Sequence, residues 1–425
     1  MEKFITRALL LVILIGQLAL LGLAIHALVD RSSSKARLNP MGSAYELNPD
    51  DTGRFWVSDF KAGEIWGINP TNGAYEIYSV SGSPVDARQA DGWLWWADGL
   101  SDILGRVSTS DGTFTHWQVP DAFGFLGTNL DNKGRLYATD SSNPTLYRLD
   151  PVETSLCTYT LPGFGASDYI LRDGDYLWLS GSFDSTILRL QTSDGSLTWW
   201  SLPENSSPFG MALDAQGNLW YADQGINVLA QLNPITNELV SYILPSGNYP
   251  QMIAIQSGSI WYTEQSLPSI GRMDPIIAEH SIVKLTFHDQ QLSPSCNSIS
   301  PSNSGKVSIT NGKMSWGNQT STIIVNAAGW QIYQLPEGSD PWGIALTDFG
   351  YVVDSGRQIL FRFVPTQEAP STLANLPPVT PTYIGTPAVI PTSISTSAVT
   401  PSITTPTDYG RYYLPVVFNT YPIVP

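Results

Sequence analysis

One short pattern recurs along most of this chain and constrains its fold more than any other feature. Six of its eight copies place aromatic and aliphatic residues before an acid, as in Leu94–Asp98, Leu219–Asp223 and Ile260–Glu264. By subtraction of their positions, the equivalent aromatic residues stand 39 to 42 residues apart: Trp56, Trp95, Tyr137, Trp178, Trp220 and Trp261. A period of about 40–45 residues in strand-like segments predicts an all-β fold, the β-propeller.

The fifth copy shows what one repeat contains. Pro208–Asp214 and Asn218–Asp223 predict a first and a second strand, and Val228–Leu232 predicts a third. Asn233–Asn237 consists of residues that favour tight turns, and Leu239–Pro245 alternates as a fourth strand does. Four antiparallel strands per repeat correspond to one propeller blade.

Counting the copies predicts eight blades, because the weaker copies Met314–Asn318 and Gly350–Asp354 follow the clear ones. Seven blades is the alternative, if the unit around residues 290–336 is irregular. The last repeat lacks a fourth strand, and Ala36–Pro40 resembles the missing one. We therefore expect the N-terminal strand to close the ring, which removes an open sheet edge, and the propeller to span residues 36–364.

Residues 1–30 predict a membrane helix. The stretch Ala8–Val29 is apolar except for Gln17 and His26, and at 1.5 Å per residue it is long enough to cross a bilayer. Lys3 and Arg7 favour a cytoplasmic N-terminus. An uncleaved signal anchor with an extracytoplasmic domain is favoured; the alternative is a cleaved signal peptide and a secreted or cell-surface protein. Residues 31–35 are a spacer.

The composition changes after the propeller. Residues 365–408 are rich in Pro, Ser and Thr, carry only Glu368 and Asp408 as charges, and predict a disordered, mucin-like stalk. Residues 409–425 form an apolar-aromatic tail that is too short to cross a membrane. This tail is either a docking tag or an adhesive end without a role.

Charge and cysteine usage exclude some classes of protein. The net charge of −16 disfavours a nucleic-acid partner, because an acidic surface repels phosphates. Cys157 and Cys296 fall on distant repeats without CxxC spacing, so we expect two isolated thiols and no disulfide. Residues 288–304 form a Ser/Pro-rich insertion, more typical of a passive loop than of a functional one.

The acid that ends the second strand is the most repeated candidate for chemistry: Asp59, Asp98, Asp140, Asp223, Glu264 and Asp354. Loops that follow second and fourth strands share one face of a propeller, so these acids would ring that face near the channel. They could hold a divalent cation or a cationic ligand, with Asp98, Asp140 and Asp223 as candidate ligand-binding acids. Alternatively, each accepts backbone N–H groups in its own turn, which repetition in most units favours.

Three aromatic residues fall on the same face with less regularity. Phe209, Tyr249 and Trp342 lie between fourth and first strands, where they could form a rim for a small molecule, a glycan or a peptide, or pack as ordinary core residues. No Ser/His/Asp pattern or Gly-rich phosphate loop occurs, and His116, His280 and His288 fall near outer strands. Catalysis at the channel would therefore need a carboxylate.

Four segments carry a family resemblance: Pro208–Ala212, Leu219–Asp223, Ile260–Glu264 and Ser269–Met273. Over residues 36–364 the chain resembles the virginiamycin B lyase (streptogramin lyase) family. The resemblance implies a seven-bladed propeller and a Mg²⁺-assisted elimination that opens a cyclic depsipeptide with channel histidines and a glutamate. Glu264 matches the glutamate, which makes it the candidate catalytic and metal-binding residue.

The first strands depart from the family pattern where a lyase would show Pro-His-Gly. This chain has Phe209, Gln251 and Trp342 at those positions. The favoured function is therefore a membrane-anchored, monomeric surface protein that binds a ligand or partner without the lyase histidines. The alternative is a Mg²⁺-dependent lyase, or another hydrolytic propeller enzyme, that uses Glu264.

Overall fold

The computed structural model describes residues 47–363, apart from gaps at residues 81, 163–168, 246–248, 265–268, 314–321, 328, 336, 348 and 356–358. The expected membrane helix, the closing strand Ala36–Pro40, the stalk and the tail all lie outside these residues. No helix occurs among the residues described, and so none that could cross a membrane. The fold of this part is therefore all-β, as the repeats predict.

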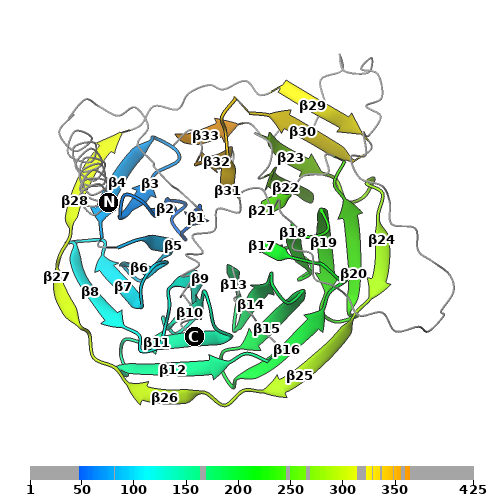
Figure 1. Ribbon diagram of the computed structural model, residues 1–425. Helices are drawn as coiled ribbons and strands as arrows, with labels where there is room; N and C mark the ends of the chain where they lie inside the picture. Colours follow the sequence, from blue (N-terminus) through cyan, green and yellow to red (C-terminus); the bar gives the residue numbers. More distant parts are fainter. Residues whose placement is uncertain are drawn as a thin grey trace, which may run out of the picture. The chain divides into compact units, whose positions relative to one another are not determined.

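Seven antiparallel sheets follow one another around a ring (Figure 1). Blade 1 contains β1 (Asn48–Pro49), β2 (Phe55–Asp59), β3 (Glu64–Ile68) and β4 (Ala74–Ser79). Blade 2 contains β5 (Pro84–Ala90), β6 (Trp93–Asp98), β7 (Ile103–Ser108) and β8 (Thr113–Gln118). Blade 3 contains β9 (Phe125–Leu130), β10 (Leu136–Asp140), β11 (Thr145–Asp150) and β12 (Ser155–Thr160).

The remaining blades repeat this order from the channel outward. Blade 4 contains β13 (Tyr169–Asp173), β14 (Tyr176–Gly181), β15 (Thr186–Gln191) and β16 (Ser196–Ser201). Blade 5 contains β17 (Pro208–Leu213), β18 (Leu219–Asp223), β19 (Val228–Asn233) and β20 (Glu238–Ile243). Blade 6 contains β21 (Pro250–Gln256), β22 (Ser259–Glu264), β23 (Ser269–Met273) and β30 (Trp330–Gln334). Blade 7 contains β31 (Pro341–Leu346), β32 (Gly350–Asp354) and β33 (Ile359–Phe363).

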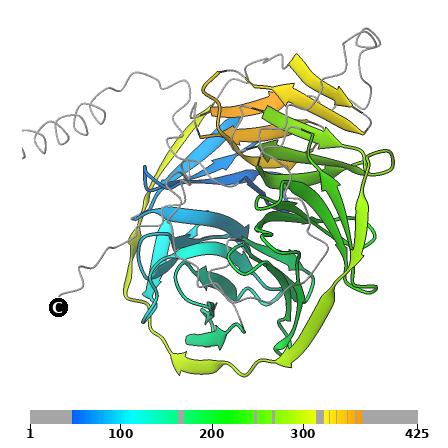
Figure 2. The same cartoon turned by 45° about the vertical axis from the view of Figure 1, so that its right-hand side comes forward.

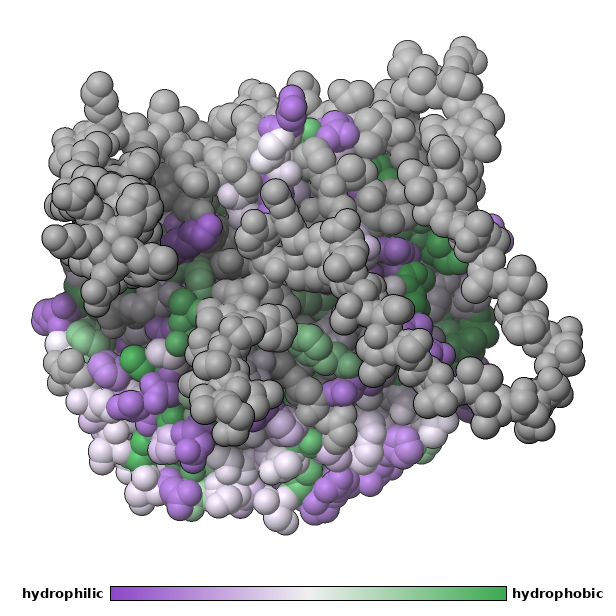
Figure 3. Space-filling view, viewed as in Figure 1, coloured by the Kyte–Doolittle hydropathy of each residue, from purple (hydrophilic) through white to green (hydrophobic). Residues whose placement is uncertain are grey.

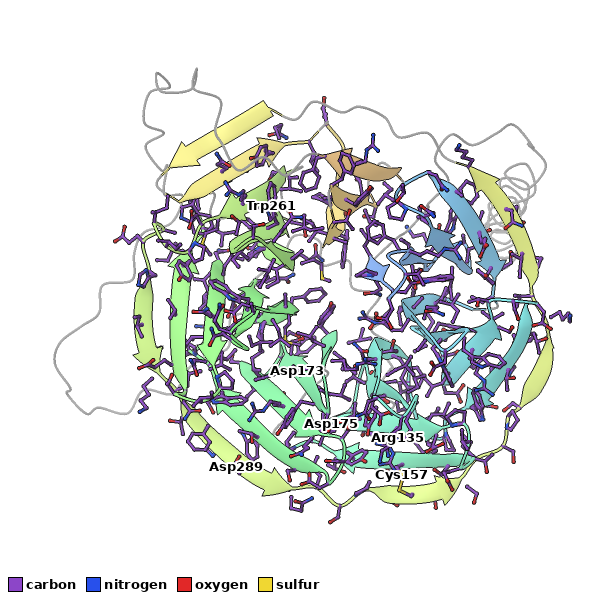
Figure 4. The ribbon with its side chains drawn as sticks, turned by 180° about the vertical axis from the view of Figure 1, so that it is seen from behind. Arg135, Cys157, Asp173, Asp175, Trp261 and Asp289 are labelled. Carbon is purple, nitrogen blue, oxygen red and sulfur yellow. A yellow bond between two sulfur atoms is a disulfide. The ribbon has the colours of Figure 1, made fainter. Side chains whose placement is uncertain are left out.

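The repeated aromatic residue of each second strand packs within its own blade and towards its neighbours. Trp95 stacks on Trp117, and Trp178 stacks on Trp200, with ring centroids 6.0 and 5.5 Å apart. Trp261, deep in blade 6 (Figure 4), stacks on Tyr333 at 5.8 Å. These rings are buried in clusters that also contain residues of the next blade, as Trp95 does with Phe125 and Trp178 with Phe209, so the period in the sequence marks the packing between successive blades.

Blade 6 carries an insertion between its third and fourth strands, residues 281–313, which we call the belt. Its five strands run backwards around the ring and add a fifth strand to blades 5, 4, 3, 2 and 1 in turn. They are β24 (Ser281–Lys284), β25 (Thr286–Gln291), β26 (Ser295–Ser298), β27 (Asn303–Lys306) and β28 (Ser308–Lys313). Both ribbon views place the belt on the outside (Figure 1 and Figure 2). After residues 314–321, β29 (Thr322–Ala327) forms the outer strand of blade 6.

The belt corrects the predicted number of blades. The described residues form seven sheets, and the unit around residues 290–336 that was counted as a blade is mostly the belt. Residues 281–286 lie outside blades 5 and 4, because β24 pairs with β20 and β25 with β16. The fourth strand of blade 6 is β30, which pairs with β23. The belt is exposed and mostly polar, with Ile282, Val283 and Phe287 as its exposed apolar residues, and the outer surface over β25 and β26 is mostly hydrophilic or neutral (Figure 3).

A disulfide joins Cys157 to Cys296, so the expectation of two isolated thiols is wrong. Cys157 lies in β12 of blade 3, directly opposite Cys296 in the belt strand β26. Figure 4 shows Cys157 and its sulfur bond at the outer edge of blade 3. The spacing of the two cysteines in the sequence was misleading, because the belt returns to a blade that the chain completed 139 residues earlier.

Candidate ligand site at the channel face

The loops that follow second and fourth strands lie on one face of the ring, which we call the channel face. The acids that end the second strands are buried there: Asp59, Asp98, Asp140, Asp223, Glu264 and Asp354. Turns between first and second strands, and between third and fourth strands, form the opposite face. The expected gathering of acids near one face agrees with the strand order of the blades.

In two of the candidate acids, both carboxylate oxygens accept backbone N–H groups. Asp98 Oδ2 accepts the N–H of Ser83 at 3.0 Å, and Asp98 Oδ1 accepts the N–H of Leu100 at 2.9 Å. Asp140 Oδ2 accepts the N–H of Phe123 at 3.3 Å, while Asp140 Oδ1 binds two further N–H groups of its own turn. Each of these acids therefore links the loop before the first strand of its blade to the loop after the second strand. This is the structural role that we expected as the alternative to ligand binding.

Asp223 uses its two oxygens unequally. Its Oδ1 accepts the N–H groups of Ser207, Gly225 and Ile226 at 2.8–3.3 Å, whereas Oδ2 has no hydrogen-bond partner within the described residues. The Ser206 hydroxyl lies near this carboxylate, but not in hydrogen-bond geometry. Burial raises the pKa of Asp223, although the hydrogen bonds oppose that shift. This acid keeps one acceptor unused at the channel face.

Glu264 ends β22 and is fully buried. Its Oε2 accepts a hydrogen bond from the hydroxyl of Ser269, the first residue of the next strand. Its negative charge adds to burial in raising the pKa of the neighbouring Tyr262. Within the described residues, no group of three His, Cys, Asp or Glu side chains is placed to hold a metal ion. The residue matched to the family's glutamate is thus held inside the blade.

The predicted aromatic residues divide into a buried pair and an exposed tyrosine. Phe209 of blade 5 and Trp342 of blade 7 are buried and meet edge to face, with ring centroids 6.4 Å apart. Blade 6 lies between blades 5 and 7 in the ring, so this contact crosses the inner edge of blade 6. We call the pair Phe209 and Trp342 the floor of the channel face. Tyr249 lies in the loop before β21 and is 40% exposed.

Sequence reasoning missed three other exposed apolar residues of the channel face. With Tyr249 they form what we call the rim: Leu100 (49% exposed), Phe123 (67%), Phe183 (61%) and Tyr249. The loops of Leu100 and Phe123 touch, because a Cβ on Gly124 would stand 2.5 Å from the carbonyl oxygen of Gly99. Asp98 and Asp140 also bind the N–H groups of Leu100 and Phe123, so the buried acids position two rim residues.

Gln251 is the second residue of β21 and is 1% exposed. Its Oε1 has no hydrogen-bond partner within the described part of the chain, and neither has Oδ1 of Asn227 in the loop after β18. Three histidines have described positions, and all lie at the outer strands, away from the channel: His116 in β8, His288 in β25, and His280 before β24. These positions agree with the prediction that histidines fall near outer strands.

Comparisons with known proteins agree with this architecture. The model of the virginiamycin B lyase family matches residues 35–313. A solved virginiamycin B lyase from Staphylococcus aureus has a TM-score of 0.56 at 17% identity, covering 75% of this chain and 94% of that one. A solved streptogramin B lyase has a TM-score of 0.57 at 20% identity, with coverage of 75% and 94%. No curated protein sequence matches this chain.

Proposed function

Because this chain belongs to the virginiamycin B lyase family, we propose that it keeps the family's propeller as a binding surface and carries out no lyase chemistry. The rim and the floor of the channel face bind a small molecule, a glycan or a peptide. Residues 1–30 anchor the protein in the membrane, with the propeller outside the cytoplasm. A Mg²⁺-dependent reaction through Glu264 is the alternative.

The observation that carries this proposal is the filling of the channel. Phe209 and Trp342 stand where a lyase would show histidine, and they are buried against each other at 6.4 Å. Two apolar rings cannot act as general base or general acid. Glu264 lies buried beside Ser269, whereas the histidines with described positions lie at the outer strands. The exposed rim, in contrast, offers apolar surface of the kind that marks binding sites.

The disulfide supports the proposed location. Cys157–Cys296 links the belt to blade 3, and disulfides persist in oxidising environments such as the periplasm and the cell surface. Charged residues on the belt, such as Asp289 in β25 and Lys313 in β28, also suit an outer surface in water, because exposed edge strands of low charge invite aggregation.

A ligand screen read by thermal shift tests the proposal. The full-length protein is screened with glycans, peptides and aromatic compounds. Hits are then measured on the Phe123→Ser/Phe183→Ser double variant. We expect the shift of a channel-face ligand to be lost in this variant, because both exposed rings contact the ligand.

The matched control removes apolar side chains from the opposite face. Val152 and Ile235 are 83% and 86% exposed at turns between third and fourth strands, so Val152→Ser/Ile235→Ser should leave every shift unchanged. Hits that respond to the control pair instead of the rim pair would contradict a channel-face site. So would a screen in which no compound stabilises the wild-type protein.

A further inference from the structure

Three side-chain acceptors at the channel face have an oxygen without a hydrogen-bond partner within the described residues. They are Asp223 Oδ2, Asn227 Oδ1 and Gln251 Oε1. Asp223 ends the second strand of blade 5, Asn227 lies in the loop that follows, and Gln251 is at the start of blade 6. An unpaired acceptor that is buried costs about 1–3 kcal/mol, so a donor bound between these adjoining parts of blades 5 and 6 would stabilise the protein.

One segment of β17 connects these acceptors with the aromatic floor. Pro208 is the cross-strand partner of Asp223, and a Cβ on Gly210 would stand 2.6 Å from the carbonyl oxygen of Gln251. Phe209 lies between these two residues and meets Trp342 edge to face. Unused acceptors and two aromatic rings therefore occur together where blades 5 and 6 face the channel.

The same face of blades 2 and 3 provides a contrast. Both oxygens of Asp98 and both oxygens of Asp140 accept backbone N–H groups, so neither acid has an oxygen without a partner. The rim there is apolar, with Leu100 and Phe123 side by side. At blades 2 and 3 the channel face thus offers apolar side chains, whereas blades 5 and 6 offer the three unpaired acceptors.

We infer that the junction of blades 5 and 6 binds an organic ammonium group, held by Asp223, Asn227 and Gln251 against the rings of Phe209 and Trp342. This inference rests on the proposed function and names the ligand's chemistry. An ammonium has three N–H donors, one for each of the three unpaired oxygens. Aromatic faces attract cations, and the net charge of −16 favours their approach. The ring attached to the ammonium would separate Phe209 from Trp342.

The test uses phenethylammonium as the probe and 2-phenylethanol as its neutral match. Binding to the full-length protein is measured by isothermal titration calorimetry at neutral pH. We expect phenethylammonium to bind at least ten-fold more tightly than 2-phenylethanol. Gln251→Met keeps the length of the side chain and removes the acceptor, so it should weaken phenethylammonium binding roughly ten-fold or more, as for a lost hydrogen bond to a charged group.

Two further variants complete the experiment. Asp223→Asn keeps an acceptor for the turn, removes the charge and should also reduce the preference for the ammonium. Gln216→Met changes an exposed glutamine on the opposite face of the same blade and should have no effect. If Gln251→Met does not fold, the inference is tested by the preference of the wild-type protein for phenethylammonium over 2-phenylethanol and by the loss of that preference in Asp223→Asn.

Equal affinity for the two probes would overturn the inference, as would unchanged binding in both Gln251→Met and Asp223→Asn. Heat released by CaCl₂ but not by phenethylammonium would also overturn it and assign the oxygens to a metal ion. These failures differ from a failure of the proposed function, because other ligands of the screen would still depend on Phe123 and Phe183.

Discussion

Asp214 shows how one side chain fixes a turn of this propeller. Its carboxylate accepts hydrogen bonds from Asn218, from the indole of Trp220 and from the amide of Gln231, at 2.9–3.0 Å. Burial alone would raise the pKa of Asp214, but these hydrogen bonds outweigh it and lower the pKa. Asp50 occupies the same place in blade 1, and its pKa is lowered in the same way. Both carboxylates stabilise the fold in their ionised form.

We predict that Asp214→Ala lowers the free energy of unfolding by about 1–3 kcal/mol at neutral pH, because the buried indole N–H of Trp220 loses its acceptor. The folded-state pKa of Asp214 lies below the unfolded value of about 3.9. The stabilisation is therefore complete well above about pH 4 and is lost as the pH falls through the folded pKa. Urea denaturation of wild type and variant should show a difference that shrinks on acidification. A constant difference would contradict this assignment.

Residue-level roles were only partly predictable from the sequence. The acids that end second strands stood out because they recur with the period of the blades. The sequence favoured a structural role for them, and Asp98 and Asp140 have the expected backbone partners. Leu100, Phe123 and Phe183 were missed because they lie in irregular loops, where one apolar residue carries no periodic signal. Their exposure depends on how neighbouring loops pack.

At the scale of elements, the belt is the feature that sequence patterns could not reveal. Its strands have only four to six residues, and β24, β25 and β26 are exposed along their whole length, including the apolar Ile282, Val283 and Phe287. Neither alternation nor an apolar run marks such strands, since each gains its place from hydrogen bonds to a distant blade. The copy at Met314–Asn318 then suggested an extra blade, although residues 314–321 lie outside the described residues.

We predict that Cys157→Ser destabilises the propeller by roughly 2–5 kcal/mol, because the disulfide no longer limits the unfolded chain over a separation of 139 residues. Guanidinium denaturation without reductant measures this. Cys296→Ser and the double variant should lose the same amount, since either change breaks one bond. A reductant should destabilise the wild type to the level of these variants and leave the variants unchanged. Additive losses in the double variant would show that packing, and not the bond, causes the effect.

At the scale of the whole molecule, the repeat predicted the architecture because every blade needs an aromatic residue at one depth to pack against its neighbour. The number of blades was wrong by one for a physical reason: an insertion that pairs with other blades resembles a repeat when only spacing is considered. The floor formed by Phe209 and Trp342 shows a similar limit, because its two rings come from blades that are not neighbours.

The most direct test of the account is the fate of a streptogramin B at this channel. Full-length protein is incubated with quinupristin and Mg²⁺, and mass spectrometry follows opening of the ring, with Glu264→Gln as the control for a carboxylate-dependent reaction. We predict no more ring opening than in buffer, because buried apolar rings occupy the positions where a lyase would show histidine. Ring opening that requires Mg²⁺ and disappears in Glu264→Gln would contradict the account and establish the enzyme.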